Sequence, residues 1–172
     1  RFDDRQQAVF DKDGLLVVGR VDGDPCERVL AVGAHAAIAP QFPSVQTEEL
    51  PGRILAPGFV DLHVHYPQID VVGSPAEGLL PWLERYTFVQ ESRFDDAAHA
   101  AQVAQFFITE LLRNGVTTAL AFATSHPASV DAFFTEARRR RMRMIGGKVL
   151  QDRHSPDGVR DQTEQSLVDT ET

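Results

Sequence analysis

One stretch decides the fold of this chain, Pro57-Gly58-Phe59-Val60-Asp61-Leu62-His63-Val64-His65. Pro57 and Gly58 are a turn signal that ends whatever precedes them. The apolar residues that follow are typical of a short strand buried on both faces, as in a parallel sheet. Residues two apart in a strand point to the same side, so His63 and His65 project together and can share a divalent metal such as zinc. A bare His-x-His can also be two unrelated polar residues at a strand exit, but the turn and the strand before it favour the metal.

Residues 1–56 are predicted to form a small all-β unit. The short apolar runs lie at residues 8–10, 15–18, 28–32 and 53–55. Turns rich in Asp, Pro and Gly separate these runs, which is typical of successive short strands. Such a unit is too short to close a sandwich, so it requires strands from elsewhere. His35 follows one of the runs without any ligand spacing, and we interpret it as a structural or surface residue.

From Pro57 onward, predicted strands alternate with predicted helices. The strands cover residues 58–63, 117–122 and 144–150, and the helices cover residues 95–114, 129–140 and 162–172. This alternation is the signature of a parallel α/β sheet or barrel. A complete (β/α)8 barrel needs about 250 residues, so residues 57–172 supply less than half of one. We therefore expect an α/β fold with the first three βα units of a TIM-like barrel, in a chain that is a fragment of a longer protein.

The helix predicted over residues 95–114 has the clearest signals. Asp95 or Asp96 can cap its start, and Gly115 can end it. One apolar stripe recurs at steps of three and four residues, at Ala100, Val103, Ala104, Phe107, Leu111 and Leu112. His99 belongs to the same helix, and we interpret it as solvated.

Three other features of this region complete the prediction. The long connection over residues 66–94 holds a short helix at 79–86, and so long an excursion after a strand is usually functional. The arginine run at 138–141 complements the dipole at a helix end. Lys148 is predicted to lie inside the third barrel strand, away from the edge where a metal-bridging lysine would be needed. We therefore assign Lys148 a structural role.

Composition and charge narrow the classes of partner. The 172 residues carry a net charge of −8 with a pI near 5.2, which argues against a nucleic-acid partner and fits a soluble protein with a small-molecule substrate. Cys26 is the single cysteine, which excludes an internal disulfide and a cysteine-based zinc site. No apolar run approaches the ~18 residues of a membrane span, and the opening at Arg1 has neither a signal peptide nor an initiator methionine. We expect a cytoplasmic protein without a membrane partner, whose start is missing.

The stretch 57–65 resembles the first barrel strand of the amidohydrolase superfamily, metal-dependent hydrolases built on a (β/α)8 barrel. The unit before it resembles part of that superfamily's N-terminal β-sandwich. Within the superfamily the chain is similar to the guanine deaminase family. The matching stretches are His63-Val-His65-Tyr-Pro-Gln68, Trp82-Leu-Glu-Arg-Tyr86-Thr-Phe88, Asn114-Gly-Val-Thr-Thr118, Phe122-Ala-Thr-Ser-His126 and Gly147-Lys-Val-Leu-Gln-Asp152-Arg. The chain departs from the family at Val89, where proline is usual, and at His154, where asparagine is common.

The resemblance implies roles for individual residues. His63 and His65 would be ligands of one zinc ion per subunit. Gln68 would hydrogen-bond the purine edge, because a carboxamide both donates and accepts. Trp82 would line the pocket. His126, at the face where barrel active sites lie, is a further pocket-lining candidate, with an ordinary turn histidine as the alternative.

The reaction implied by the resemblance is zinc-dependent hydrolytic deamination of guanine to xanthine and ammonia. The enzyme would be a cytoplasmic homodimer of purine catabolism, with its other metal ligands and a proton-shuttling glutamate beyond Thr172, so the piece alone would be inactive. One alternative is another aminohydrolase or dechlorinase of the superfamily acting on an amino-heterocycle, against which Gln68 and Trp82 favour guanine. The other is a non-catalytic barrel scaffold, which would have no reason to keep both histidines. The cytidine-deaminase motifs His-x-Glu and Pro-Cys-x-x-Cys are absent.

Overall fold

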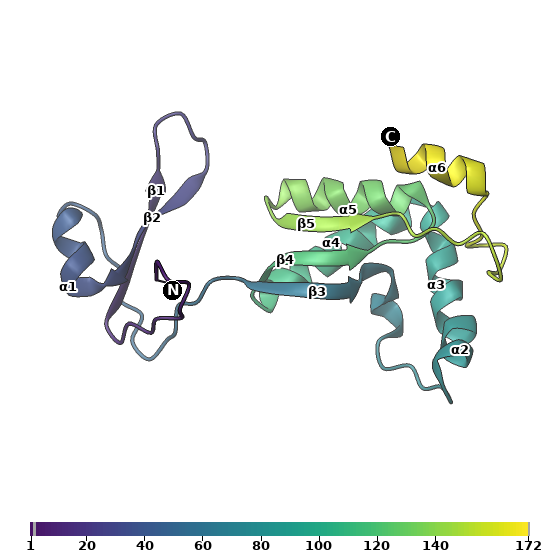
Figure 1. The fold of residues 1–172 in the computed structure, drawn as a ribbon, viewed down its shortest axis with the longest axis horizontal. Helices are drawn as coiled ribbons and strands as arrows, with labels where there is room; N and C mark the ends of the chain where they lie inside the picture. Colours follow the sequence, from purple (N-terminus) through teal and green to yellow (C-terminus); the bar gives the residue numbers. More distant parts are fainter. Residues whose placement is uncertain (2, 172) are drawn as a thin grey trace. The chain divides into compact units, whose positions relative to one another are not determined.

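The computed structural model describes residues 1 and 3–171 (Figure 1). The chain forms two compact units, Arg1–Pro57 and Gly58–Thr172. None of the described helices combines the length and the apolar character that crossing a membrane requires.

The first unit is an antiparallel hairpin followed by a short helix. Its elements are β1 (Gly14–Arg20), β2 (Glu27–Ala34), α1 (His35–Ile38) and the 3-10 turn η1 (Ala39–Gln41). β1 and β2 confirm the strands predicted at 15–18 and 28–32. Asp24 stabilises the turn between them, because its Oδ1 accepts a hydrogen bond from the backbone N–H of Cys26 at 2.8 Å. His35 is exposed at the start of α1, as predicted for a surface residue.

Two strand predictions in the first unit are wrong. Residues 53–55 belong to no strand, Ile54 is 78% exposed, and no strand among residues 1 and 3–171 pairs with this run. Residues 8–10 contain a single bridge residue, Ala8, in place of a strand. Of the large hydrophobic residues described in this unit, only Val17 is buried. Val29, on the facing strand, is 60% exposed. The need for strands from elsewhere therefore stays a prediction.

The second unit is a parallel sheet with helices packed on one face (Figure 1). Its strands lie in the order β3 (Phe59–His65), β4 (Val116–Phe122) and β5 (Arg143–Gly147). α4 (Ala97–Arg113) precedes β4, α5 (Pro127–Arg139) connects β4 to β5, and α6 (Thr163–Glu171) follows β5. The strand–helix alternation predicted from Pro57 onward is confirmed as a mixed α/β fold with a parallel sheet.

The start of β3 explains why a glycine stands before it. A Cβ atom added to Gly58 would lie 2.0 Å from Oγ1 of Thr117, which is too close for any side chain. Gly58 therefore lets β3 begin directly beside β4.

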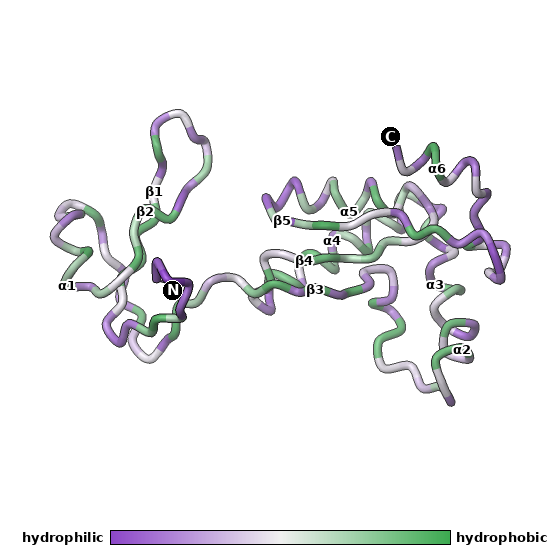
Figure 2. The backbone as a smooth tube through the Cα atoms, in the orientation of Figure 1, coloured by the Kyte–Doolittle hydropathy of each residue, from purple (hydrophilic) through white to green (hydrophobic). Residues whose placement is uncertain are grey.

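α4 has the cap and the buried face that its sequence predicts. Asp96 caps it, since its Oδ1 accepts the backbone N–H of Ala98 at 2.8 Å, and Gly115 follows the helix with φ of 78°. Its predicted apolar stripe is buried, except for Leu112, which is 37% exposed. In Figure 2 hydrophilic and hydrophobic residues alternate along α4 and α5, as expected for helices that bury one face.

Aromatic side chains fill the layer between the sheet and these helices. Tyr66 is fully buried, with its ring centroid 5.4 Å from that of Phe133 and 5.5 Å from that of Phe94. Its hydroxyl donates to the backbone carbonyl of Ser129 in α5, with the two oxygens 2.5 Å apart. Residue 66 therefore ties the exit of β3 to α5.

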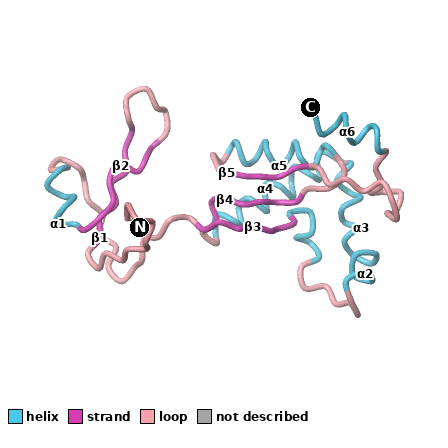
Figure 3. The backbone as a smooth tube through the Cα atoms, viewed as in Figure 1, coloured by secondary structure: helices cyan, strands magenta, loops and turns pink. Residues whose placement is uncertain are grey.

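The connection between β3 and α4 contains more helix than predicted. It runs through η2 (Tyr66–Val71), α2 (Leu79–Trp82), the π-helical turn η3 (Leu83–Thr87), α3 (Phe88–Glu91) and η4 (Ser92–Asp95). A loop separates η2 from α2 (Figure 3). The short helix predicted at 79–86 is thus the first part of a nearly continuous helical segment with a π turn inside it.

The prediction for Lys148 is wrong about its position. β5 ends at Gly147, so Lys148 lies just past the carboxyl end of the strand and not inside it. Its side chain is 4% exposed, and its Nζ donates to Asp161 Oδ1 at 2.6 Å and to Ser166 Oγ at 2.8 Å. A buried ammonium requires such partners. Lys148 is still structural, because it ties the loop after β5 and α6 to the sheet.

Candidate active site

β3 brings the two histidines together at its carboxyl end. The ring centroids of His63 and His65 are 5.1 Å apart, with the planes at 68°. Phe122, which pairs with His65 across the sheet, stacks on the His65 ring at 4.7 Å and meets the His63 ring edge-on at 5.2 Å. The end of β4 therefore holds both imidazoles in place by packing.

The local environment keeps His65 in the form that binds metals. Burial of the half-buried ring lowers the pKa of His65, and the neighbouring His63 lowers it further. A lowered pKa favours the neutral imidazole, and a neutral ring nitrogen is the one that ligates.

Gln68 joins His65 to a buried carboxylate. Its Nε2 lies 3.1 Å from Nδ1 of His65 and donates to Oε1 of Glu91 at 3.0 Å. The 3-10 turn η2 places Gln68 there, because it turns the chain back beside the strand end immediately after His65. An amide nitrogen only donates, so in this orientation of Gln68 the unprotonated Nδ1 of His65 accepts the hydrogen bond.

The two imidazoles fit zinc as ligands, but they do not complete a site. Within residues 1 and 3–171 no group of three or more His, Cys, Asp or Glu side chains is arranged to hold a metal. A zinc site needs at least three protein ligands. His63 and His65 would therefore supply two of them, and the others would have to come from beyond the described residues.

Trp82 and His126 lie on other elements than the histidine pair. Trp82 is half-buried in α2, and among the described contacts none joins it to His63 or His65. His126 is the N-cap residue of α5, and its Nε2 donates to the backbone carbonyl of Gly158 at 3.0 Å. His126 thus fastens the loop after β5 to the start of α5. The substrate-binding roles of Gln68, Trp82 and His126 stay predictions.

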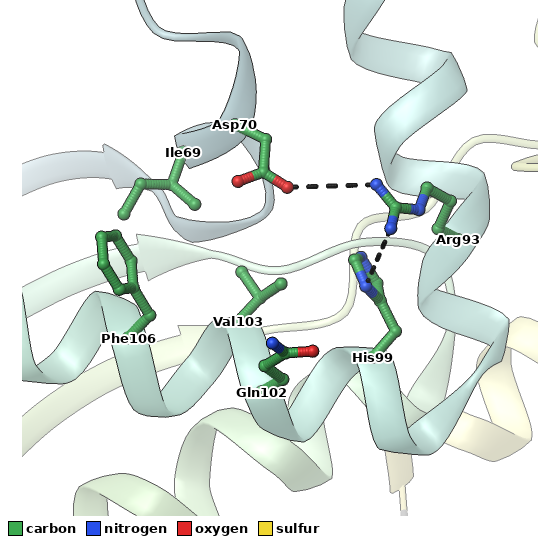
Figure 4. A pocket seen from close by; sticks show the side chains of 7 residues that line it. All are labelled: Ile69, Asp70, Arg93, His99, Gln102, Val103 and Phe106. Carbon is green, nitrogen blue, oxygen red and sulfur yellow. Dashed lines mark hydrogen bonds and ion pairs between the residues drawn. The ribbon is translucent and has the colours of Figure 1, made fainter.

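The prediction that His99 is solvated is wrong. The side chain packs edge-on against Phe94 at 4.9 Å, and its Nε2 is buried without a hydrogen-bond partner among the described residues. Arg93 lies 3.4 Å from its Nδ1 (Figure 4). His99 therefore borders a hollow of about 270 Å³ between η2, η4 and α4, which contains neither His63 nor His65.

Two residues of the site have no role in the sequence-based prediction. The position of Phe122 could have been predicted from the sequence, because the end of the second predicted strand lies beside the end of the first. Glu91 could not be placed in this way, since it meets Gln68 only through the packing of α3 against η2.

A parallel α/β sheet with a histidine pair at the carboxyl end of one strand is typical of the amidohydrolase class of proteins. Comparison of the sequence with protein families agrees with this class. The model of the Amidohydrolase family matches residues 54–171, and the chain belongs to this family.

Three similar proteins are guanine deaminases. The guanine deaminase of Escherichia coli K12 is 49% identical, over 91% of this chain and 35% of that protein. The crystal structure of guanine deaminase from Bradyrhizobium japonicum superposes with a TM-score of 0.83 at 37% identity, covering 92% of this chain and 33% of that one. The crystal structure of guanine deaminase from C. acetobutylicum with bound guanine in the active site gives a TM-score of 0.64 at 35% identity, over 67% of this chain and 28% of that one. The chain spans about a third of the length of the curated relatives it matches.

Proposed function

We propose that this chain forms the first part of an amidohydrolase (β/α)8 barrel that converts guanine to xanthine and ammonia with the help of zinc. Residues 57–172 would supply its first three βα units, and residues 1–56 part of a β-sandwich. The observation that carries the proposal is the joint placement of His63, His65 and Gln68 at the carboxyl end of β3. Barrel enzymes place their active sites at that end of the strands.

The residues of this chain would divide the work as follows. His63 and His65 would hold the zinc. When bound, the zinc would act as a Lewis acid and activate water. Gln68 would meet the polar edge of the purine through its amide oxygen, because both hydrogens of its Nε2 are engaged by His65 and Glu91. Phe122 would exclude water from one side of the imidazoles through its stacking contact. Trp82 and His126 would line the pocket farther out.

Three further expectations belong to the proposal. The complete protein would bind one zinc per subunit, form a homodimer and act in the cytoplasm as an enzyme of purine catabolism. Each can be measured on the purified protein or in fractionated cells, by metal analysis, by light scattering and by immunodetection.

The experiment is a substrate comparison with the protein that carries the whole barrel. Release of xanthine and ammonia from guanine is compared with ammonia release from adenine, cytosine and an amino-triazine. We expect guanine to be preferred by at least about 100-fold in kcat/KM, because a site built to hydrogen-bond one polar edge rejects another strongly. Preference for a control substrate would replace guanine by another amino-heterocycle. A protein that binds no zinc and turns over none of them would be a scaffold.

A further inference from the structure

Glu91 is a buried carboxylate that lies beside the candidate site. Its side chain belongs to the last residue of α3, and the residue is 6% exposed. In Figure 1, α3 lies at the end of the sheet toward which the strands point. Burial raises the pKa of Glu91, and the hydrogen bond from Gln68 acts in the opposite direction.

A comparison with another buried carboxylate shows what is unusual about Glu91. Glu136 in α5 is 8% exposed, but Arg139 and Arg140 donate to its oxygens at 2.6 and 3.0 Å, and these bonds lower its pKa. In the described part of the chain Glu91 has no ion pair, and its hydrogen bond is the one from Gln68. Burying a carboxylate without a cation costs free energy, and the hydrogen bond from Gln68 is the contact among the described residues that offsets it.

The contact with Glu91 fixes the orientation of the Gln68 side chain. A glutamine side chain has three rotatable bonds and needs fixed partners to keep one orientation. Gln68 has two, because the same Nε2 that lies 3.1 Å from His65 Nδ1 donates to Glu91 at 3.0 Å. Between them the two contacts hold the amide beside Nδ1, at the edge of the His65 ring.

The π-helical turn η3 accounts for the direction in which Glu91 points. A π turn inserts one residue into a helix, which rotates every later side chain by about 100° around the axis. Such turns occur often at functional sites. Because η3 (Leu83–Thr87) comes directly before α3, it sets the phase that brings Glu91 to Gln68.

We propose that Glu91 is a positioning residue for substrate recognition: its carboxylate holds the amide of Gln68 beside His65 and so keeps that amide ready for the purine edge. The inference rests on the proposed function only for the choice of guanine as the probe.

The test uses matched variants of the protein that carries the whole barrel. Glu91→Gln keeps a hydrogen-bonding group of the same length, and Glu91→Met keeps the length without one. Glu136→Met is the control, since it removes an equally buried carboxylate that has no contact with the site. For each variant kcat and KM with guanine, bound zinc and the melting temperature are measured, and crystal structures of the Glu91 variants locate Gln68.

We expect Glu91→Met to lower kcat/KM for guanine about 10-fold with zinc retained, because a freely moving Gln68 forfeits its bond to the substrate. Glu91→Gln should stay within about threefold of wild type. Glu136→Met should lower the melting temperature and leave kcat/KM within about twofold. In the crystal, Gln68 should leave its place beside His65 in Glu91→Met and keep it in Glu91→Gln.

A double-mutant comparison separates positioning from a general effect on folding. In a Gln68→Ala background, Glu91→Met should cost less than about twofold, since the side chain that it positions is gone. An equal loss in both backgrounds, or a Gln68 that does not move in Glu91→Met, would overturn the inference. If wild type does not act on guanine but Gln68 moves as expected, the proposed substrate is wrong and the positioning role of Glu91 stands.

Discussion

The polar carboxyl end of the sheet and the apolar layer behind it are joined by the peptide bond between His65 and Tyr66. His65 is half-buried beside an amide and a second histidine, whereas Tyr66, the next residue, is fully buried among aromatic rings. Consecutive side chains at a strand end point to different sides, which permits this change within one residue. The polar site therefore lies directly on a layer of packed aromatic side chains. Substitutions in one region should therefore leave the other unaffected.

The largest effect is expected in the support. Phe133 is 1% exposed and contacts Tyr66 from α5, so Phe133→Ala should lower the free energy of unfolding by about 3–5 kcal/mol through the cavity that it leaves. Urea unfolding followed by circular dichroism measures this. Phe106→Ala in α4 is the matched control, because Phe106 is 53% exposed and should cost less than about 1 kcal/mol. Equal losses in both variants would contradict the packing described here.

The next effect is expected at the site. His63→Ala and His65→Ala in the protein that carries the whole barrel should each lower kcat/KM by more than about 100-fold, since losing only an outer partner of a metal ligand costs 10–100-fold. Metal analysis should show that zinc is lost, while the free energy of unfolding in excess chelator stays close to wild type. His35→Ala, an exposed histidine of the first unit, serves as the control. Full zinc occupancy in a His63→Ala/His65→Ala variant would refute the ligand assignment.

A smaller effect is expected on substrate turnover, without a change in metal binding. Gln68→Ala should cost about 1–3 kcal/mol of transition-state binding, or roughly 5- to 150-fold in kcat/KM for guanine, because one polar group of the purine is left unpaired. Zinc content should not change. Gln102→Ala is the control, since Gln102 lines the separate hollow beside His99. Unchanged guanine kinetics in Gln68→Ala would remove the residue from the recognition site.

The smallest effect concerns the backbone of the loop after β5. His154 has φ of 54°, in the left-handed region that asparagine tolerates better than histidine. His154→Asn should therefore raise the free energy of unfolding by about 0.5 kcal/mol, and His154→Ala should give no gain. The two variants are compared by thermal melting. A more stable alanine variant would mean that the backbone conformation is not what limits this loop.

Local sequence predicted most of the second unit. The apolar stripe of α4, its cap at Asp96 and the strand after Pro57 each carry a periodic or steric signal, and all three are confirmed in place. The predicted burial of that strand on both faces is wrong for the described residues, because Phe59, Val60 and Leu62 are 62%, 58% and 73% exposed. The first unit was predicted less well. Its run at 53–55 has the composition of a strand but no partner strand, and a strand requires pairing that composition cannot reveal.

The sequence by itself determined that His63 and His65 share one side of a strand end, because the period of two is a property of the backbone. Only the tertiary structure decided what surrounds them. Glu91 lies 23 residues beyond Gln68 in the sequence and reaches it through a π turn and the packing of α3. Lys148 lies past the end of the strand predicted for it, and its partners, Asp161 and Ser166, lie on the loop and helix that follow. Contacts of this kind depend on where separate elements pack, and no local pattern records that.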